Sequence, residues 1–366
     1  MSDLISKKYF RWIPLIGFAI CGTVLGQTSP DRFVQWDKNK DDRLVVSELP
    51  ERLRVNFPKV DSNQDGFISR DEHDHFVKGN RSGDRQSQMP RAKSFKDINY
   101  VTSGHPRQKL DLFIPTLKSG KPFPLIIYIH GGAWKSGDKR AAPVEEFLRS
   151  GFAVASVNYR LSQHAKFPAQ LEDCRNAVKW LRDQAQQYHI DPNQFGVFGS
   201  SAGGHLVCLL GTHTETKTES GPQQLGRPTK PTVANSRVQA VCSWFGPTEF
   251  LTMNQQSGAD SVIDHDAPNS PESLLIGGAL QDNQTLAKIA SPLSYVSQDD
   301  PPFLIMHGDR DRLVPVEQSR QLHSQLVNAG VDCKLIVVQG AGHGLNREEH
   351  LPTVIRFFQE RLQLKK

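Results

Sequence analysis

Residues 195–206 read F-G-V-F-G-S-S-A-G-G-H-L, and this stretch decides the fold. Its apolar start, 195–198, is typical of a buried strand, and a helix-like run continues to 212. Between them G-S-S-A-G matches G-x-S-x-G, in which a sharp strand-to-helix turn lifts the hydroxyl of the central serine out of a sheet. Glycines on either side let neighbouring backbone pass closely. The motif therefore predicts that Ser201 is a nucleophile.

Short apolar runs alternate with helix-like segments on both sides of this turn. Such runs suit strands that helices cover on both faces, so we predict an α/β fold with a mostly parallel sheet. The expected strands are Lys109–Ile114, Leu125–Ile129, Ala153–Val157, Phe195–Phe198, Ala240–Trp244, Phe303–Met306 and Lys334–Val338. The expected helices are Ala169–Tyr188, His205–Thr212, Glu317–Ala329 and Glu348–Leu362. Residues 214–236 and 253–290 do not fit the alternation and are expected to be excursions or a partial lid.

The sequence H-G-G-A-W at 130–134 directly follows an expected strand and lies about 70 residues before Ser201. Two consecutive glycines let the backbone turn its N–H groups towards a tetrahedral intermediate. The N–H group after the nucleophile supplies a further donor. We therefore predict that Gly131, Gly132 and Ala202 form an oxyanion hole. The alternative is a plain glycine turn that ends a strand.

A serine hydroxyl needs a neighbouring base, and this fold supplies the partners in the order serine, acid, histidine. H-G-D-R-D-R-L-V-P at 307–315 follows a strand and offers Asp309 and Asp311 as acids. We select Asp311, just before the L-V-P step, and expect Asp309 to organise the loop. G-A-G-H-G at 340–344 places His343 on a glycine-rich loop, where it can act as the general base. The carboxylate would fix the imidazole tautomer and stabilise the imidazolium.

Taken together, these motifs resemble the bacterial acetyl- and feruloyl-esterase branch of the α/β hydrolases, which is related to the hormone-sensitive-lipase-like esterases. S-P-E-S-L-L-I-G-G, at the start of the stretch 270–296, is also similar to that branch. The resemblance covers about residues 95–364 and implies an α/β-hydrolase fold with an eight-stranded sheet. It also implies the Ser201, Asp311 and His343 triad. Many relatives have H-G-G-G where this chain has H-G-G-A, which leaves the donor pair open.

The resemblance implies a serine esterase that hydrolyses small acyl esters through an acyl-enzyme, including acetyl or feruloyl esters of polysaccharides. This chemistry needs no metal or organic cofactor. The H-G-G-x-W string also occurs in relatives that hydrolyse formyl-kynurenine, so an amidase, arylformamidase or exopeptidase is an alternative. An alternative of another class is a non-catalytic, calcium-dependent binding protein that retains the hydrolase scaffold.

Two acidic frames of twelve residues each, 37–48 and 61–72, match the EF-hand calcium loop. Oxygen ligands are expected at positions 1, 3, 5, 7, 9 and 12, with glycine at position 6. The second frame has Gly66 at that position, whereas the first has Asp42 there and Val45 at position 9. We predict a small α-helical EF-hand pair over residues 30–78 with structural calcium; a solvated acidic region is the alternative. The expected ligands are Asp61, Asn63, Asp65, Phe67, Ser69 and Glu72, and Asp37, Asn39, Asp41, Arg43 and Glu48.

The N-terminal segment 1–26 has a positive start and an apolar centre, as a signal peptide does. Its apolar run of about 14 residues is shorter than the roughly 20 that span a bilayer, which favours cleavage over a permanent anchor. We expect a secreted or periplasmic protein without stable membrane insertion after cleavage. The polar segment 79–95 is expected to be a linker, followed by the catalytic domain at 96–366.

The chain has 366 residues, a formal net charge of +5 and an ordinary apolar content. No basic stripe carries interleaved aromatic residues, so we expect no nucleic-acid partner. The expected partner is a small ester or a polysaccharide ester. The sequence leaves the oligomeric state open.

Overall fold

The computed structural model describes residues 32–61, 65–74, 92–116, 120–213 and 236–362. The chain divides into two compact units, Met1–Gln88 and Met89–Lys366, which are described separately. The predicted signal peptide and most of the predicted linker lie outside the described residues, so export stays a prediction. Among the described residues, no helix is both long and apolar enough to cross a membrane.

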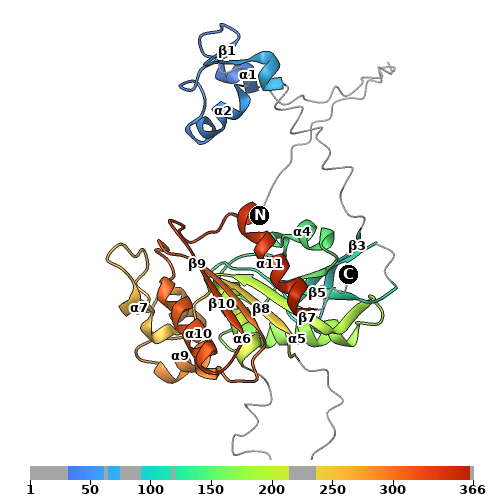
Figure 1. The fold of residues 1–366 in the computed structure, drawn as a ribbon. Coiled ribbons are helices and arrows are strands. Elements are labelled where there is room, and N and C mark those ends of the chain that lie inside the picture. The colour runs from blue at the N-terminus through green and yellow to red at the C-terminus, as the bar shows by residue number, and fades with distance from the viewer. Residues whose placement is uncertain (1–31, 62–64, 75–91, 117–119, 214–235, 363–366) are drawn as a thin grey trace, which may run out of the picture. The chain divides into compact units, whose positions relative to one another are not determined.

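The larger unit is built on an eight-stranded sheet with the order β10-β9-β8-β7-β5-β6-β4-β3 (Figure 1). The strands are β3 (Ala92–Asn99), β4 (Lys109–Pro115), β5 (Phe123–Ile129), β6 (Ala153–Val157), β7 (Ile190–Ser200), β8 (Ala240–Trp244), β9 (Phe303–Gly308) and β10 (Cys333–Val338). The pairs β3–β4 and β4–β6 are antiparallel, and the others are parallel. The predicted mostly parallel sheet is therefore confirmed.

The first strand of this sheet, β3, was not expected from the sequence. Residues 92–95 fall within the predicted linker, yet Ala92 pairs with Pro115 and Phe95 with Leu112. The strand lies at the edge of the sheet and its letters, A-K-S-F-K-D-I-N, are mostly polar. An edge strand held by pairing with its neighbour lacks the apolar run that marks a buried strand.

Helices cover both faces of the sheet, as predicted. Successive side chains of β5 point to opposite faces of the sheet. Ile127 packs in one apolar cluster and Ile126 in the other, so each face needs a cover of helices. The first cluster includes residues of α5, α6 and α10, and the second includes residues of α4 and α11, which crosses the opposite face (Figure 1). These helices are α4 (Val144–Arg149), α5 (Ala169–Asp183), α6 (Ala202–Thr212), α10 (Val316–Asn328) and α11 (Arg347–Arg361), and η2 is a 3₁₀ turn at Lys139–Ala141. Helix α5 ends before the expected Tyr188.

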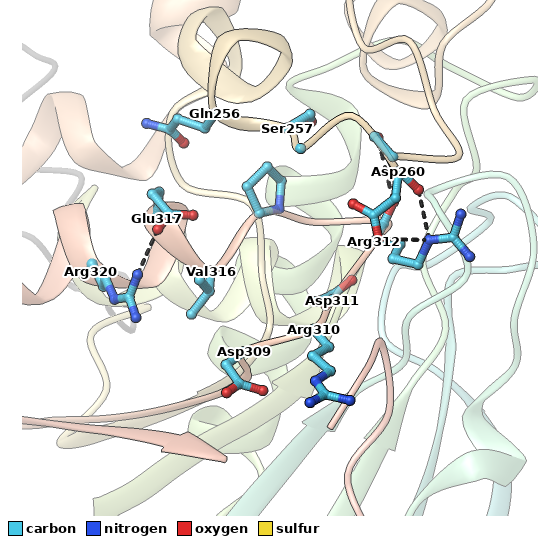
Figure 2. A pocket seen from close by; sticks show the side chains of 13 residues that line it. Gln256, Ser257, Asp260, Asp309, Arg310, Asp311, Arg312, Val316, Glu317 and Arg320 are labelled. Carbon is cyan, nitrogen blue, oxygen red and sulfur yellow. Dashed lines mark hydrogen bonds and ion pairs between the residues drawn. The ribbon is translucent and has the colours of Figure 1, made fainter. Parts of the chain in front are cut away.

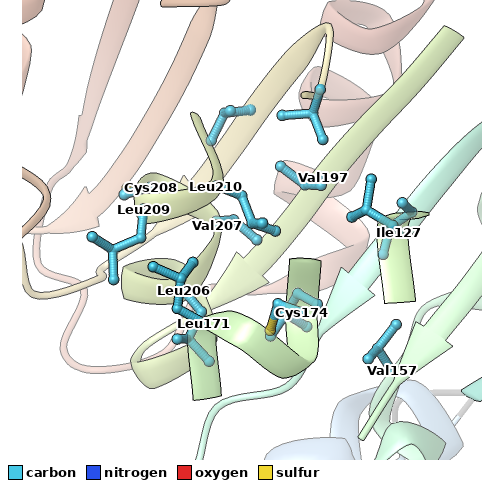
Figure 3. Packing of buried hydrophobic residues seen from close by; sticks show 14 of the residues in the cluster. Ile127, Val157, Leu171, Cys174, Val197, Leu206, Val207, Cys208, Leu209 and Leu210 are labelled. Carbon is cyan, nitrogen blue, oxygen red and sulfur yellow. The ribbon is translucent and has the colours of Figure 1, made fainter. Parts of the chain in front are cut away.

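Helix α6, which directly follows Ser201, is buried along its whole length. Figure 3 shows its side chains Leu206 to Leu210 packed near Val197 of β7 and near Leu171 and Cys174 of α5. Cys208, within this helix, is a buried free thiol, and burial raises its pKa to about 12. The turn that carries Ser201 is therefore anchored between the sheet and a second layer of helix.

The segment between β8 and β9 contains short helices, whereas the sequence predicted an excursion or a partial lid over 253–290 without assigning helices to it. It contains η4 (Phe250–Thr252), α7 (Met253–Gln256), α8 (Pro271–Ile276), α9 (Gln284–Ala290) and η5 (Pro292–Tyr295). Short amphipathic turns of this length show little periodicity, which explains why the helical signal was weak. The other expected excursion, 214–236, lies outside the described residues except for its last position.

The smaller unit contains α1 (Arg32–Trp36), β1 (Arg43–Leu44), η1 (Glu51–Asn56), α2 (Phe57–Val60) and β2 (Ile68–Ser69), and residues 70–74 are helical. Strands β1 and β2 pair antiparallel, with Leu44 opposite Ile68. Both residues belong to one apolar cluster with Phe33, Leu49, Phe57 and Val60. The two acidic frames are thus joined through the eighth position of each.

Candidate active site

Ser201 occupies the sharp turn between β7 and α6, as the sequence predicts. Its backbone has φ 55° and ψ −125°, a strained combination for a residue with a side chain, and its N–H group donates to the carbonyl of Trp244 at 2.9 Å. A Cβ on Gly203 would overlap the carbonyl oxygen of Ile129, and one on Gly199 would overlap the carbonyl of Gly203. The close approach of these chain segments therefore requires glycine on both sides of the serine.

The structure brings Ser201, His343 and Asp311 together in one hydrogen-bonded chain. His343 Nε2 lies 2.9 Å from Ser201 Oγ, and His343 Nδ1 lies 2.7 Å from Asp311 Oδ2. The three residues follow β7, β10 and β9, which are parallel strands of one sheet, so their loops meet at one edge. This arrangement can transfer a proton from the serine hydroxyl to the imidazole.

The carboxylate of Asp311 is held ionised by its surroundings. Its side chain is fully buried, and burial opposes ionisation. Hydrogen bonds from His307 and His343, and from the backbone of Val314, nevertheless keep the pKa of Asp311 well below its usual range. An ionised Asp311 accepts the Nδ1–H of His343 and thereby leaves Nε2 free to take the serine proton. His307 supports Asp311 in this way and was not singled out from the sequence.

Asp309, the other acid considered in the sequence, has a different place. Its Oδ1 accepts the backbone N–H of Gly340 at 2.6 Å, in the loop that carries His343. The structure therefore places Asp311 against the imidazole and Asp309 in the connection between the two loops.

The predicted oxyanion donors line the same cavity as Ser201 and His343. This cavity has a volume of about 550 Å³, and Gly131, Gly132 and Ala202 are in its wall. Gly132 has φ 111°, a conformation that favours glycine. Within the described part of the chain, no acceptor takes the backbone N–H groups of these three residues. Their N–H groups are therefore free to bind a developing oxyanion.

Two histidines support residues 130–134, here called the oxyanion loop because it carries the predicted donors Gly131 and Gly132. His130 lies 2.7 Å from the carbonyl of Gly131 and stacks on Tyr159 with ring centroids 4.5 Å apart. His205 accepts from Trp134 Nε1 at 3.2 Å and lies 2.7 Å from the carbonyl of Ala290. Burial lowers the pKa of each histidine to about 4, so both are neutral near pH 7. Neither was identified from the sequence as a proton donor or base. Neither imidazole bonds to Ser201, although the backbone N–H of His205 donates to the carbonyl of Ser201 at 2.9 Å.

Replacing His205 with glutamine is expected to reduce the loss of stability on acidification. The neutral histidine has a pKa of about 4 when folded, below the ordinary 6.5, so below pH 6.5 the unfolded chain binds the proton first. Stability present above pH 6.5 is therefore lost down to pH 4, by roughly 3 kcal/mol at 1.36 kcal/mol per pH unit. Urea unfolding between pH 7 and pH 4 measures this slope. A slope equal to that of the native chain, or of a control His323→Gln variant, would contradict the assignment.

A second pocket lies beside the loop that carries Asp309 and Asp311. It has a volume of about 490 Å³ and is lined by residues 256–258, 260 and 261 and by side chains between Asp309 and Arg320 (Figure 2). Arg312 pairs with Asp260 at 3.2 Å, and Arg320 pairs with Glu317 at 2.6 Å. Its charges are thus largely internal to its wall, and it contains neither Ser201 nor His343.

The two acidic frames of the smaller unit share one hydrogen-bond scheme. At position 1 of each frame, Asp37 accepts the N–H groups of Asp41 and Asp42, and Asp61 accepts those of Asp65 and Gly66. At position 12, Glu48 accepts the N–H of Val45, and Glu72 accepts that of Ser69. Position 6 has positive φ in both frames, 57° at Asp42 and 90° at Gly66.

This donor set suits a hard cation, because it is rich in carboxylate oxygens. Asn63, a predicted ligand, lies outside the described residues. Among the residues that are described, no group of three His, Cys, Asp or Glu side chains gathers as a metal cluster. The calcium ligands therefore stay a prediction.

Comparison with known proteins places this site in a family. The BD-FAE family model matches residues 110–326, which is more than half of the chain. The chain belongs to the BD-FAE family. The match includes Ser201, Asp311 and the oxyanion loop, and ends before His343. Family membership agrees with the α/β-hydrolase fold and with the esterase resemblance of the sequence motifs.

Solved structures similar to this BD-FAE chain include a truncated form of a carbohydrate esterase from gut microbiota. It is 32% identical, covers 75% of this chain and 98% of its own, and has a TM-score of 0.67. An acetyl ester-xyloside bifunctional hydrolase from Caldicellulosiruptor lactoaceticus is 25% identical, with coverage of 75% and 96% and a TM-score of 0.54.

Two esterases of Mycobacterium tuberculosis also match the BD-FAE chain. LipC is 29% identical over 66% of this chain, and LipQ is 30% identical over 65% of it. The matches span 58% and 54% of those proteins, so the chain corresponds to little more than half of each.

One buried carboxylate in the cavity was not identified from the sequence. Glu272 is 3% exposed and lines the wall together with Ser201 and His343. It belongs to the S-P-E-S string at 270–273, in which no strand end or glycine setting marks the glutamate as a site residue.

Proposed function

We propose that the chain is a carboxylic ester hydrolase that works through an acyl-enzyme. The observation that carries this proposal is the hydrogen-bonded chain from Ser201 Oγ through His343 to Asp311, beside free backbone N–H groups. His343 removes the serine proton while Oγ attacks the carbonyl carbon of the ester. The oxyanion that forms is bound by N–H groups of the oxyanion loop and of Ala202.

The remaining steps follow from the same groups. As the tetrahedral intermediate collapses, the C–O bond to the alcohol breaks and His343 gives its proton to the leaving oxygen. Water then enters, His343 takes one of its protons, and the hydroxide attacks the acyl carbon. Collapse of the second intermediate releases the carboxylic acid and returns the proton to Ser201 Oγ. Asp311 stays ionised throughout and stabilises the imidazolium.

We propose small acyl esters of carbohydrates, acetyl esters first, as the substrates. The cavity is bounded by apolar side chains close to Ser201, among them Trp134, Phe245 and Leu313, which suits a short acyl group. The names of two similar proteins, a carbohydrate esterase and an acetyl ester-xyloside hydrolase, support this class. Feruloyl esters are the second acyl group to test.

Matched substrates test the reaction class. Initial rates on p-nitrophenyl acetate, on the corresponding anilide and on acetylated xylan are compared, with p-nitrophenyl esters of increasing acyl length beside them. We expect ester hydrolysis to exceed anilide hydrolysis by orders of magnitude and to decline with acyl length. Faster cleavage of the anilide would indicate an amidase and would contradict the proposal.

We also propose that the smaller unit binds calcium as a structural ion. The support is the pair of frames with one hydrogen-bond scheme and positive φ at position 6. Most of the negative charge around the ion would come from the carboxylates at positions 1 and 12 of each frame. These are Asp61 and Glu72 in the second frame, and Asp37 and Glu48 in the first.

Calcium is expected to stabilise this unit in the full chain. With a Kd on the order of 10⁻⁴ M, as in extracellular modules, 10 mM calcium adds about 2.7 kcal/mol to its unfolding free energy. Calorimetry with calcium, with chelator, and with a Glu72→Gln variant measures the change, and Glu51→Gln serves as control. A transition that chelator does not move would show that the frames are only an acidic surface.

A further inference from the structure

Glu272 is an unusual residue to find in a cavity suited to a short acyl group. It lies in the first turn of α8, in the segment between β8 and β9, and its side chain is 4% exposed. Burying an ionised carboxylate costs several kcal/mol unless its oxygens are hydrogen-bonded. The partners of its two oxygens therefore indicate what the residue does.

Among the described residues, only one of those two oxygens has a hydrogen-bond partner. Glu272 Oε2 lies 3.1 Å from Nδ1 of the buried His265. Oε1 has no hydrogen-bond partner among the described residues, and it is not among the polar atoms that are sealed from solvent without a partner. Glu272 lines the cavity of Ser201 and its side chain is otherwise buried, from which we infer that Oε1 faces that cavity.

His265 holds the carboxylate in this position. Its backbone N–H donates to Asn254 at 3.1 Å, and its side chain is 1% exposed. Donation from Nδ1 to Glu272 leaves Nε2 buried with no partner in the described part of the chain. A pair that leaves a buried nitrogen unsatisfied is costly, which argues that it is kept for a purpose other than stability.

A carboxylate oxygen that faces a substrate cavity accepts hydrogen bonds from hydroxyl groups. The same negative charge disfavours a carboxylate or other anion at that place. An acyl group such as acetyl has no hydroxyl to offer, so the groups that Oε1 can bind belong to the alcohol part of the ester. Neutral sugars provide hydroxyl groups beside an esterified oxygen.

We propose that Glu272 determines specificity for the alcohol part of the substrate, by accepting a hydrogen bond from a hydroxyl of a neutral sugar next to the ester. His265 acts as its positioning residue. This inference rests on the proposed esterase function and adds the substrate contact that would select carbohydrate esters over simple ones.

The test compares two acetyl esters, an acetylated methyl xyloside and p-nitrophenyl acetate, in the native full chain and in Glu272→Gln. We expect the ratio of kcat/KM for the sugar ester to that for the nitrophenyl ester to fall about 10- to 100-fold, mainly through KM, because a hydrogen bond to a charged group contributes about 1.5–3 kcal/mol. Asp264→Asn removes an exposed carboxylate beside His265 and is the matched control, with an unchanged ratio.

Glu272→Asp keeps the charge but withdraws it from the cavity wall, and it provides the same comparison if the glutamine variant does not fold. His265→Gln is expected to lower the ratio less than Glu272→Gln does. An equal loss on both esters would show that the His265–Glu272 pair is only structural and would overturn the inference while leaving the esterase function intact. A native chain inactive on both esters would overturn the function and the inference together.

Discussion

Replacing Ser201 with alanine is expected to lower kcat on p-nitrophenyl acetate by about 10⁶-fold, the size of loss found when a triad serine is removed. The variant loses the atom that forms the acyl-enzyme, while the oxyanion donors and the cavity remain. Its fold should be retained, because the hydroxyl of Ser201 bonds only to His343 among the described residues. Initial-rate kinetics with circular dichroism as a check on folding measure both quantities.

The neighbouring serine supplies the control for this prediction. Ser200 precedes the turn and ends β7, so Ser200→Ala is expected to cost less than tenfold in kcat. An alanine variant at 201 that retains activity within tenfold of the native chain would contradict the assignment. So would a Ser200→Ala variant with the larger loss.

Replacing Asp311 with asparagine is expected to lower kcat by about 10⁴-fold, because an amide no longer holds His343 in the tautomer that accepts the serine proton. The hydrogen bonds that lower the pKa of Asp311 keep its carboxylate ionised at every pH above the ordinary pKa of an aspartate. The loss should therefore be of similar size between about pH 5 and pH 8. Rates at several pH values in this interval measure it.

Asp309→Asn is the matched control, since it changes the other acid of the same loop. An asparagine keeps an Oδ1 that can accept the N–H of Gly340, so we expect less than a tenfold loss. If Asp309→Asn were the more damaging of the two substitutions, the acid would have been assigned to the wrong residue.

Much of the catalytic unit could be predicted because its strongest signals are local. Residues 125–129 and 195–198 are apolar runs typical of strands buried on both faces, and they form β5 and the end of β7. Ser201 and His343 each stand among glycines directly after such a run. Backbone geometry at a strand end demands small residues there, so these positions can be recognised without knowledge of their partners.

The features that the sequence did not reveal depend on contacts between distant segments. β3 is mostly polar and forms a strand because it pairs with β4. His205 is neutral and buried because Trp134 and the carbonyl of Ala290 enclose it. Glu272 lines the cavity because the segment between β8 and β9 brings α8 close to Ser201 and His343. No spacing of letters encodes these contacts, since each is made by packing between segments far apart in the chain.

The central claim is that Ser201 is the nucleophile of an acyl-enzyme. Treating the folded native chain with a fluorophosphonate and mapping the modified peptide by mass spectrometry tests it most directly. We predict one label per chain, on Ser201, with labelling strongly slowed in the Asp311→Asn variant. A label on another residue would contradict the assignment of Ser201. No labelling of the folded chain would contradict the acyl-enzyme and would favour a calcium-dependent binding protein on a hydrolase scaffold.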